Sequence, residues 1–157
     1  MALFSKGKEI FVCPIQGNIQ ALKETPDDAF ASGALGDGIV IFPTDNKVYA
    51  PADARINFTF PTRHAIQMET KNGIEFMIHV GIDTCQLQGE GFQVVVQPKE
   101  EVKKGQLLMI FDKAFIEQKG LSLTTPMVFT NVNEEDIEIM RDGQVNALED
   151  LLIVRRK

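Results

Sequence analysis

The dominant hydrophobic pattern of the chain has a period of two residues, which is typical of β-strands with one buried face. Polar and apolar residues alternate over 55–60, and apolar side chains recur at every second position over 74–82. Turn sequences separate these runs at short intervals, as at 36–38 and 72–73. The pattern predicts an all-β protein, built as an antiparallel β-sandwich or a partly closed barrel.

Only short helical turns are expected beside the strands. One is expected to follow Asp112 through Ile116, and another is expected to follow Asn133, with Gly143 as its stop. No linker rich in Ser, Pro or Gly divides the 157 residues. We therefore expect a single domain over 1–157, with its core at about 9–157.

Charge and composition exclude several classes of function. The chain has 16 basic and 22 acidic residues, a net charge of −6, so nucleic acid is not an expected partner. The longest apolar runs, such as 39–42, are too short to span a bilayer, and we do not expect membrane insertion. Cys13 and Cys85 are too few for a disulfide framework or a zinc ribbon, which favours a reducing, cytoplasmic location.

The candidate chemistry lies on His64 and His79, the two histidines of the chain. Between them lies Asn72-Gly73, a strong signal for a β-hairpin. A two-residue loop at this point pairs His79 with Ile66 and His64 with Gly81, so that both rings share one face. A four-residue loop gives the same result, whereas a three-residue loop moves one histidine to the other face.

In that register the histidine face of the hairpin is apolar, but the main hydrophobic core lies against the opposite face. The histidine face carries Ile66, Met68 and Met77, which are typical of a docking surface. The core face carries Phe76, Ile78, Val80 and Ile82. Apolar surroundings disfavour a charged imidazole, so we expect each histidine to have a pKa below about 6.5. A neutral imidazole is a nucleophile that can accept a transferable group.

Other chemistries remain open from the residues alone. The two histidines could bind zinc if Asp83, Glu75 or a carboxylate of a partner completed the shell, as in a zinc hydrolase of related β architecture. A lipoyl or biotinyl carrier requires a lysine between apolar residues at a hairpin tip, and Lys71 has polar neighbours.

Two segments resemble a known family. Residues 62–65 (TRHA) and 73–84 (GIEFMIHVGIDT) resemble the glucose-family EIIA domain of the bacterial phosphoenolpyruvate-dependent sugar phosphotransferase system, and residues 87–92 and 102–107 continue the match. The resemblance extends from about Glu9 to the C-terminus. The resemblance implies a β-sandwich phosphocarrier that requires no cofactor or metal. The chain is similar to free-standing EIIA proteins.

The resemblance also implies roles for particular residues. His79 would accept the phosphoryl group through Nε2, and His64 would be the supporting histidine that hydrogen-bonds this group and assists its onward transfer. Thr62 would arrange the pair. The backbone around Gly81 is a further candidate, because its N–H groups could donate to the phosphoryl oxygens.

The implied partners are phospho-HPr as the phosphoryl donor and the EIIB domain of a membrane sugar permease as the acceptor. Asp37 and Asp83 would lie at the rim of the site and meet basic residues of these partners. Binding of the unphosphorylated form to metabolic enzymes, as a regulator, is compatible with this interpretation. An interfacial zinc ion is compatible with it as well.

Overall fold

The computed structural model describes residues 7–156, so residues 1–6 and 157 of the predicted domain lie outside the described part. Its strands are β1 (Lys8–Val12), β2 (Gly17–Ala21), β3 (Asp37–Pro43), β4 (Lys47–Tyr49), β5 (Ala54–Thr59), β6 (Ala65–Thr70), β7 (Glu75–His79), β8 (Phe92–Val94), β9 (Glu101–Val102), β10 (Leu107–Phe111), β11 (Thr125–Phe129), β12 (Ile137–Ile139), β13 (Gly143–Val145) and β14 (Asp150–Arg155). Its helices are η1 (Leu22–Glu24), α2 (Asp28–Ala31), η2 (Thr84–Leu87), α3 (Lys113–Gln118) and η3 (Glu134–Asp136).

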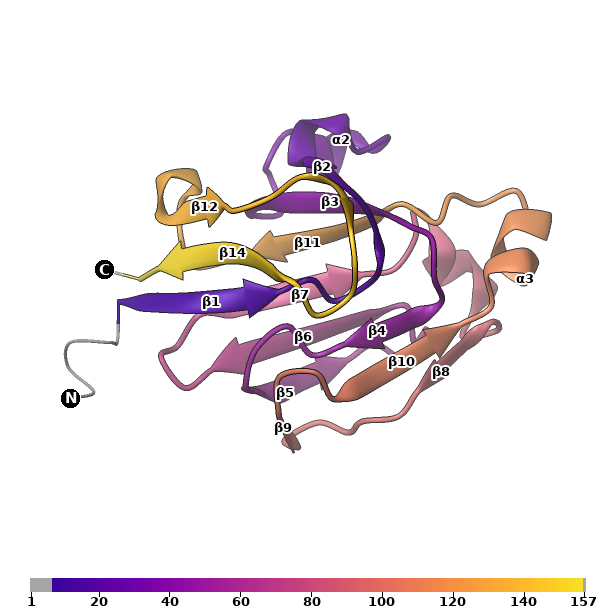
Figure 1. Ribbon diagram of the computed structural model, residues 1–157. Helices are drawn as coiled ribbons and strands as arrows, with labels where there is room; N and C mark the ends of the chain where they lie inside the picture. Colours follow the sequence, from indigo (N-terminus) through magenta and orange to yellow (C-terminus); the bar gives the residue numbers. More distant parts are fainter. Residues whose placement is uncertain (1–6, 157) are drawn as a thin grey trace.

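The strands form three antiparallel sheets. The large sheet has eight strands in the order β13-β2-β3-β11-β7-β6-β5-β9, and the two small sheets have the orders β1-β14-β12 and β4-β10-β8. Figure 1 shows β1 and β14 in front of β7, and β4, β10 and β8 in front of β6 and β5. This arrangement confirms the predicted all-β, antiparallel sandwich, and the sheets stay open rather than closing into a barrel.

The core lies between the large sheet and the small ones. The ring of Phe11 in β1 makes edge-to-face contacts with Phe76 in β7, at 5.1 Å, and with Phe129 in β11, at 5.2 Å. Phe76 and Ile78 are both buried, as the alternating pattern predicted for every second residue of β7. Aromatic pairs of this kind add stability beyond the apolar area they bury.

The register of the β6–β7 hairpin differs from the predicted one. Ala65 pairs with His79 and Met68 pairs with Phe76, while the Thr70 N–H donates to the Ile74 carbonyl at 3.0 Å. The loop therefore has three residues, 71–73, and ends on Gly73 with a φ of +84°. Three-residue hairpins commonly place a left-handed glycine at this position.

This register corrects two predicted site residues. Ile66 and Met68 are 1% and 0% exposed and belong to the core, so neither lines the histidine face. The physical reason is the period of two, because a shift of one residue moves a whole strand's apolar set to the other face. Ile82 was also misplaced, since it packs in a second cluster with Leu22, Phe30 and Val128.

The short helices agree only in part with the prediction. Asp112 caps the start of α3, and its side chain accepts from the Phe115 N–H at 3.1 Å. A single turn, η3, follows Asn133, but it ends at Asp136, so Gly143 is not its stop. Helix α2 was not predicted; Asp27 caps it by accepting from two backbone N–H groups. Within 7–156, no helix has the length and apolar character needed to cross a membrane.

Candidate functional site

The two histidine rings meet on the face of the large sheet that bears the second apolar cluster. Their centroids lie 4.6 Å apart, with the ring planes at 85°. His79 is the last residue of β7, and His64 immediately precedes β6. Figure 1 shows the neighbouring strands β6 and β7 that carry the site. The predicted meeting of the rings is therefore observed.

The rings meet for a reason other than the predicted register. Strict alternation along β6 would turn His64 toward the core, together with Ile66 and Met68. However, Arg63 has a φ of +62°, which breaks the alternation just before the strand begins. The Arg63 N–H donates to the Phe60 carbonyl at 2.8 Å, closing a tight turn. This turn immediately precedes His64, whose ring lies beside that of His79.

The hydrogen bond of His79 determines where its proton lies. Its Nδ1 is 2.8 Å from the carbonyl oxygen of Gly81. A carbonyl oxygen can only accept, so Nδ1 carries the proton in the neutral ring and donates it. Nε2 is then left with a free lone pair, which is the atom a neutral imidazole uses as a nucleophile.

His64 is held from the other side by Thr62. The Thr62 hydroxyl lies 2.7 Å from His64 Nδ1, and the His64 side chain is buried, with the residue 4% exposed. When the hydroxyl donates to Nδ1, the proton of a neutral His64 lies on Nε2, where it can be donated to an oxygen nearby. Thr62 thus contacts the ring as predicted.

Phenylalanines surround the pair, and the sequence interpretation missed them. Phe30 of α2 lies 4.9 Å from His79, and Phe60 lies 5.5 Å from His64, measured between ring centroids. Phe58 packs on Phe60 at 4.9 Å and is 47% exposed. The cap of α2 at Asp27 was a readable signal for Phe30, whereas the ring contacts depend on the fold.

This apolar setting lowers the basicity of both rings. Burial, followed by the neighbouring His79, lowers the pKa of His64 to about 4. Burial also lowers the pKa of His79, while the bond to Gly81 and the charges of Asp27 and Asp83 partly oppose this shift. Both imidazoles are therefore neutral at neutral pH, as the sequence predicted.

The remaining predicted residues lie at different distances from the pair. Asp83 is exposed, at a φ of +60°, and close enough for its charge to act on His79. Met77 lies two residues before His79 on the same face, half-exposed against the second cluster. Asp37 pairs with Phe129, which pairs with Phe76, so it lies two strands across and three residues along from His79. That offset, about 10 Å in each direction, places Asp37 outside contact with the rings.

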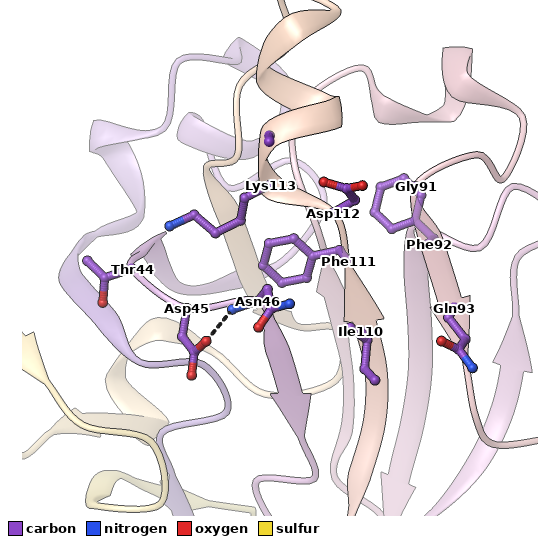
Figure 2. Close-up of a pocket in the computed structure, with 11 residues that line it drawn as sticks. Thr44, Asp45, Asn46, Gly91, Phe92, Gln93, Ile110, Phe111, Asp112 and Lys113 are labelled. Carbon is purple, nitrogen blue, oxygen red and sulfur yellow. Dashed lines mark hydrogen bonds between the residues drawn. The ribbon is translucent and has the colours of Figure 1, made fainter.

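Within the described part of the chain, neither a metal-binding group nor the pocket drawn in Figure 2 coincides with the histidines. Among residues 7–156, no group of three or more His, Cys, Asp or Glu side chains could hold a metal ion. Figure 2 shows a surface pocket of about 650 Å³ between the 44–46 loop, β8 and the start of α3, lined by residues such as Asp45, Phe111 and Lys113. It includes neither histidine.

Comparisons with known proteins agree with one another. A family model described as the phosphoenolpyruvate-dependent sugar phosphotransferase system, EIIA 1, matches residues 9–135. The chain is 38% identical over 143 residues to the glucose-specific EIIA component of Haemophilus influenzae, covering 91% of this chain and 86% of that protein. The solved structure of glucose permease IIA from Mycoplasma capricolum has a TM-score of 0.88 at 34% identity, covering 93% of this chain and 95% of that one.

Other relatives are much longer proteins. The chain is 45% identical over 130 residues to the glucosamine-specific EIICBA component of the phosphotransferase system of Bacillus subtilis. That match covers 83% of this chain and 21% of the relative. The chain thus spans about a fifth of the length of such curated relatives.

The antiparallel sandwich, the family model and the solved structure together define a phosphocarrier domain in sugar transport, and the relatives are phosphotransferase components. More particularly, the chain belongs to the EIIA 1 family of the phosphoenolpyruvate-dependent sugar phosphotransferase system, which confirms the resemblance inferred from its motifs.

Proposed function

We propose that His79 accepts a phosphoryl group from phospho-HPr and passes it to the EIIB domain of a sugar permease. The observation that carries this proposal is the hydrogen bond from His79 Nδ1–H to the Gly81 carbonyl, which leaves Nε2 unprotonated. His64 cannot take this role equally well, because it is 4% exposed and less accessible to a visiting protein. His79 is only half-buried.

The bonds formed and broken in the transfer balance without a cofactor. The lone pair of His79 Nε2 attacks phosphorus, the Nε2–P bond forms, and the P–N bond of phospho-HPr breaks, returning its electron pair to the donor. The Nδ1 proton stays on the bond to Gly81, so no base is needed. Onward transfer to EIIB reverses these roles, with Nε2 as the leaving group. Such reactions depend on in-line positioning and charge stabilisation.

The neighbours of His79 have supporting roles in this proposal. Thr62 orients His64 so that its Nε2–H donates to a phosphoryl oxygen, which stabilises the charge during transfer. Of the backbone N–H groups around Gly81, those of Val80 and Ile82 already donate to the His64 and Ser122 carbonyls, so donation by the Gly81 N–H itself stays a prediction. The contact that supports a role for Gly81 is that of its carbonyl with His79.

The rim of the site is suited to basic partners. Asp83 and Asp27 act on His79 by their charges, and the chain as a whole carries a net charge of −6. Complementary charge speeds association and selects partners. We propose that Asp83 and the more distant Asp37 meet basic residues of HPr and EIIB, that Met77 supplies apolar contact, and that the reaction takes place in the cytoplasm.

The alternatives weighed from the sequence gain no support. A zinc hydrolase would need further ligands around His64 and His79, and residues 7–156 offer no such group. Neither the site nor the relatives favour a regulatory binding protein over a phosphocarrier. Relatives of this chain are named for glucose, glucosamine and glucosides. Since similar EIIA domains occur with different sugars, we propose that the permease, and not this domain, selects the sugar.

Phosphoryl labelling tests the proposal. The chain is incubated with phosphoenolpyruvate, enzyme I and HPr, and the acid-labile label is mapped by mass spectrometry. We expect label on His79 and none on a His79→Ala variant. Label that persists on His79→Ala would refute the assignment.

The matched variant is His64→Gln, which keeps the acceptor ring and removes its neighbour. It should still take up label but deliver it to EIIB roughly 100-fold more slowly, because a donor to the transferring group is altered. Normal delivery by this variant would exclude His64 from the mechanism.

A further inference from the structure

Thr84 is a buried residue beside the site, and the proposed mechanism gives its hydroxyl no role. It follows His79 by five residues, at the start of η2, and is 0% exposed. We propose that Thr84 is a positioning residue, whose side chain fixes the protonated atom of His79 and the place of His64. The consequence for transfer rests on the proposed function, whereas the consequence for the His79 proton does not.

The Thr84 hydroxyl ties down the turn that follows β7. It donates to the carbonyl oxygen of Val80 at 2.6 Å. That carbonyl belongs to the peptide that joins Val80 to Gly81, so the bond limits rotation of this peptide plane. Removing the hydroxyl would leave the buried Val80 carbonyl without this donor, which is costly in a dry environment.

Val80 is also hydrogen-bonded to His64. The Val80 N–H donates to the carbonyl oxygen of His64 at 2.7 Å. One residue, Val80, is therefore held through its carbonyl by Thr84 and holds His64 through its N–H. A displacement of Val80 would move the backbone of His64 relative to the ring of His79.

The Thr84 methyl group packs under Gly81. A Cβ added to Gly81 would lie 2.4 Å from Thr84 Cγ2 and 2.9 Å from the Ser122 carbonyl oxygen, so only glycine fits here. Gly81 has a φ of +81°, and the next residue, Ile82, donates to that Ser122 carbonyl at 3.1 Å. Gly81 thus has little freedom, and its carbonyl stays directed at His79 Nδ1.

These contacts together link the Thr84 hydroxyl to the position of the His79 proton. Thr84 and Ser122 hold the 80–82 backbone, this backbone directs the Gly81 carbonyl at Nδ1, and the carbonyl keeps the proton off Nε2. If the carbonyl turns away, the proton can occupy Nε2 and block the lone pair. Loss of one such hydrogen bond changes an equilibrium by about tenfold.

Ring ¹⁵N NMR of His79 at neutral pH, in the full chain, measures the proton position directly. Thr84→Val keeps the shape of the side chain and removes the hydroxyl, while Thr84→Ser keeps the hydroxyl. The matched control is Thr70→Val, which removes another buried hydroxyl, one that accepts from the Ile74 N–H at the opposite end of the same hairpin. Phosphorylation rates are measured on the same samples.

We expect protonation at Nδ1 in the native chain, in Thr84→Ser and in Thr70→Val. Thr84→Val should show comparable amounts of the two ring tautomers and accept phosphoryl groups about twofold more slowly, because the tautomer with a free Nε2 falls to about half. A native tautomer in Thr84→Ser would show that the hydroxyl positions the ring. A general loss of stability would instead affect Thr70→Val as well.

The proposal is overturned if Thr84→Val keeps Nδ1 fully protonated, if Thr84→Ser changes the tautomer, or if Thr70→Val changes it equally. Should Thr84→Val not fold, Thr84→Ala replaces it with the same expected signal. A changed tautomer with no phosphorylation of the native chain would support the role of Thr84 and refute the proposed function alone.

Discussion

Mild acid should destabilise this domain in a pH range where most carboxylates are still ionised, because the domain contains a buried neutral histidine, His64. Burial, and next the proximity of His79, lower the pKa of His64 to about 4. An unfolded histidine titrates at about 6.5. Between these values the unfolded state binds more protons than the folded state, so stability rises with pH. Stability is therefore complete above the unfolded pKa and is lost as the pH falls toward the folded one.

The magnitude follows from the shift of His64. Each unit of pKa difference corresponds to about 1.4 kcal/mol. Integrated from about pH 7.5 down to about pH 5, the free energy of unfolding should fall by about 2 kcal/mol through His64 alone. The lowered pKa of His79 acts in the same direction. Burial raises the pKa of Glu9, which acts in the opposite direction.

Urea unfolding followed by circular dichroism, at several pH values in this range, measures the effect. The matched variant is His64→Gln, in which Glu9 and the other carboxylates are unchanged. The fall in stability should be about 2 kcal/mol smaller in the variant than in the native chain.

Two results would refute the reasoning. Either the native chain keeps the same stability from about pH 7.5 to about pH 5, or His64→Gln loses as much stability as the native chain. In both cases His64 would not be a neutral, buried ring, and the apolar character assigned to the site would be wrong.

Three further variants test the packing around the site. Met68→Ala should cost about 2–5 kcal/mol in urea unfolding, because Met68 is fully buried; a near-neutral result would restore the predicted outward register. Gly81→Ala should cost at least about 2 kcal/mol and shift the His79 NMR signals, and unchanged signals would argue against the close contact with Thr84. Asp27→Ala should weaken the cap of α2 by about 1 kcal/mol, seen as faster amide exchange at Phe30; unchanged exchange would mean that the cap contributes nothing.

Several features could be predicted from local sequence because their causes are local. Alternation from Phe76 to Ile78 encodes a strand with one buried face, and both side chains are buried. Asp112 was identified as a helix start because its carboxylate can accept from a backbone N–H one turn ahead. The two histidine motifs, at 62–65 and 73–84, were specific enough to indicate the family.

The hairpin register could not be predicted with the same certainty. Asn72-Gly73 is compatible with loops of two or three residues. The choice depends on distant groups: the Gly73 carbonyl accepts from the side chains of Asn131, at 2.6 Å, and Arg156, at 2.7 Å. It also depends on burying Met68 opposite Phe76, a gain that exists only once the sandwich closes.

Strand periodicity and turn residues act over a few neighbours, so local patterns were enough to predict an antiparallel β protein with two histidines beside one hairpin. How the rings meet beside the turn at Arg63, and which nitrogen of His79 is free, depend on short backbone turns that are held by distant groups such as the Ser122 carbonyl. The packing of Phe30 on His79, by contrast, directly joins segments far apart in the chain. Such contacts form only when the sheets are assembled, so no local propensity encodes them.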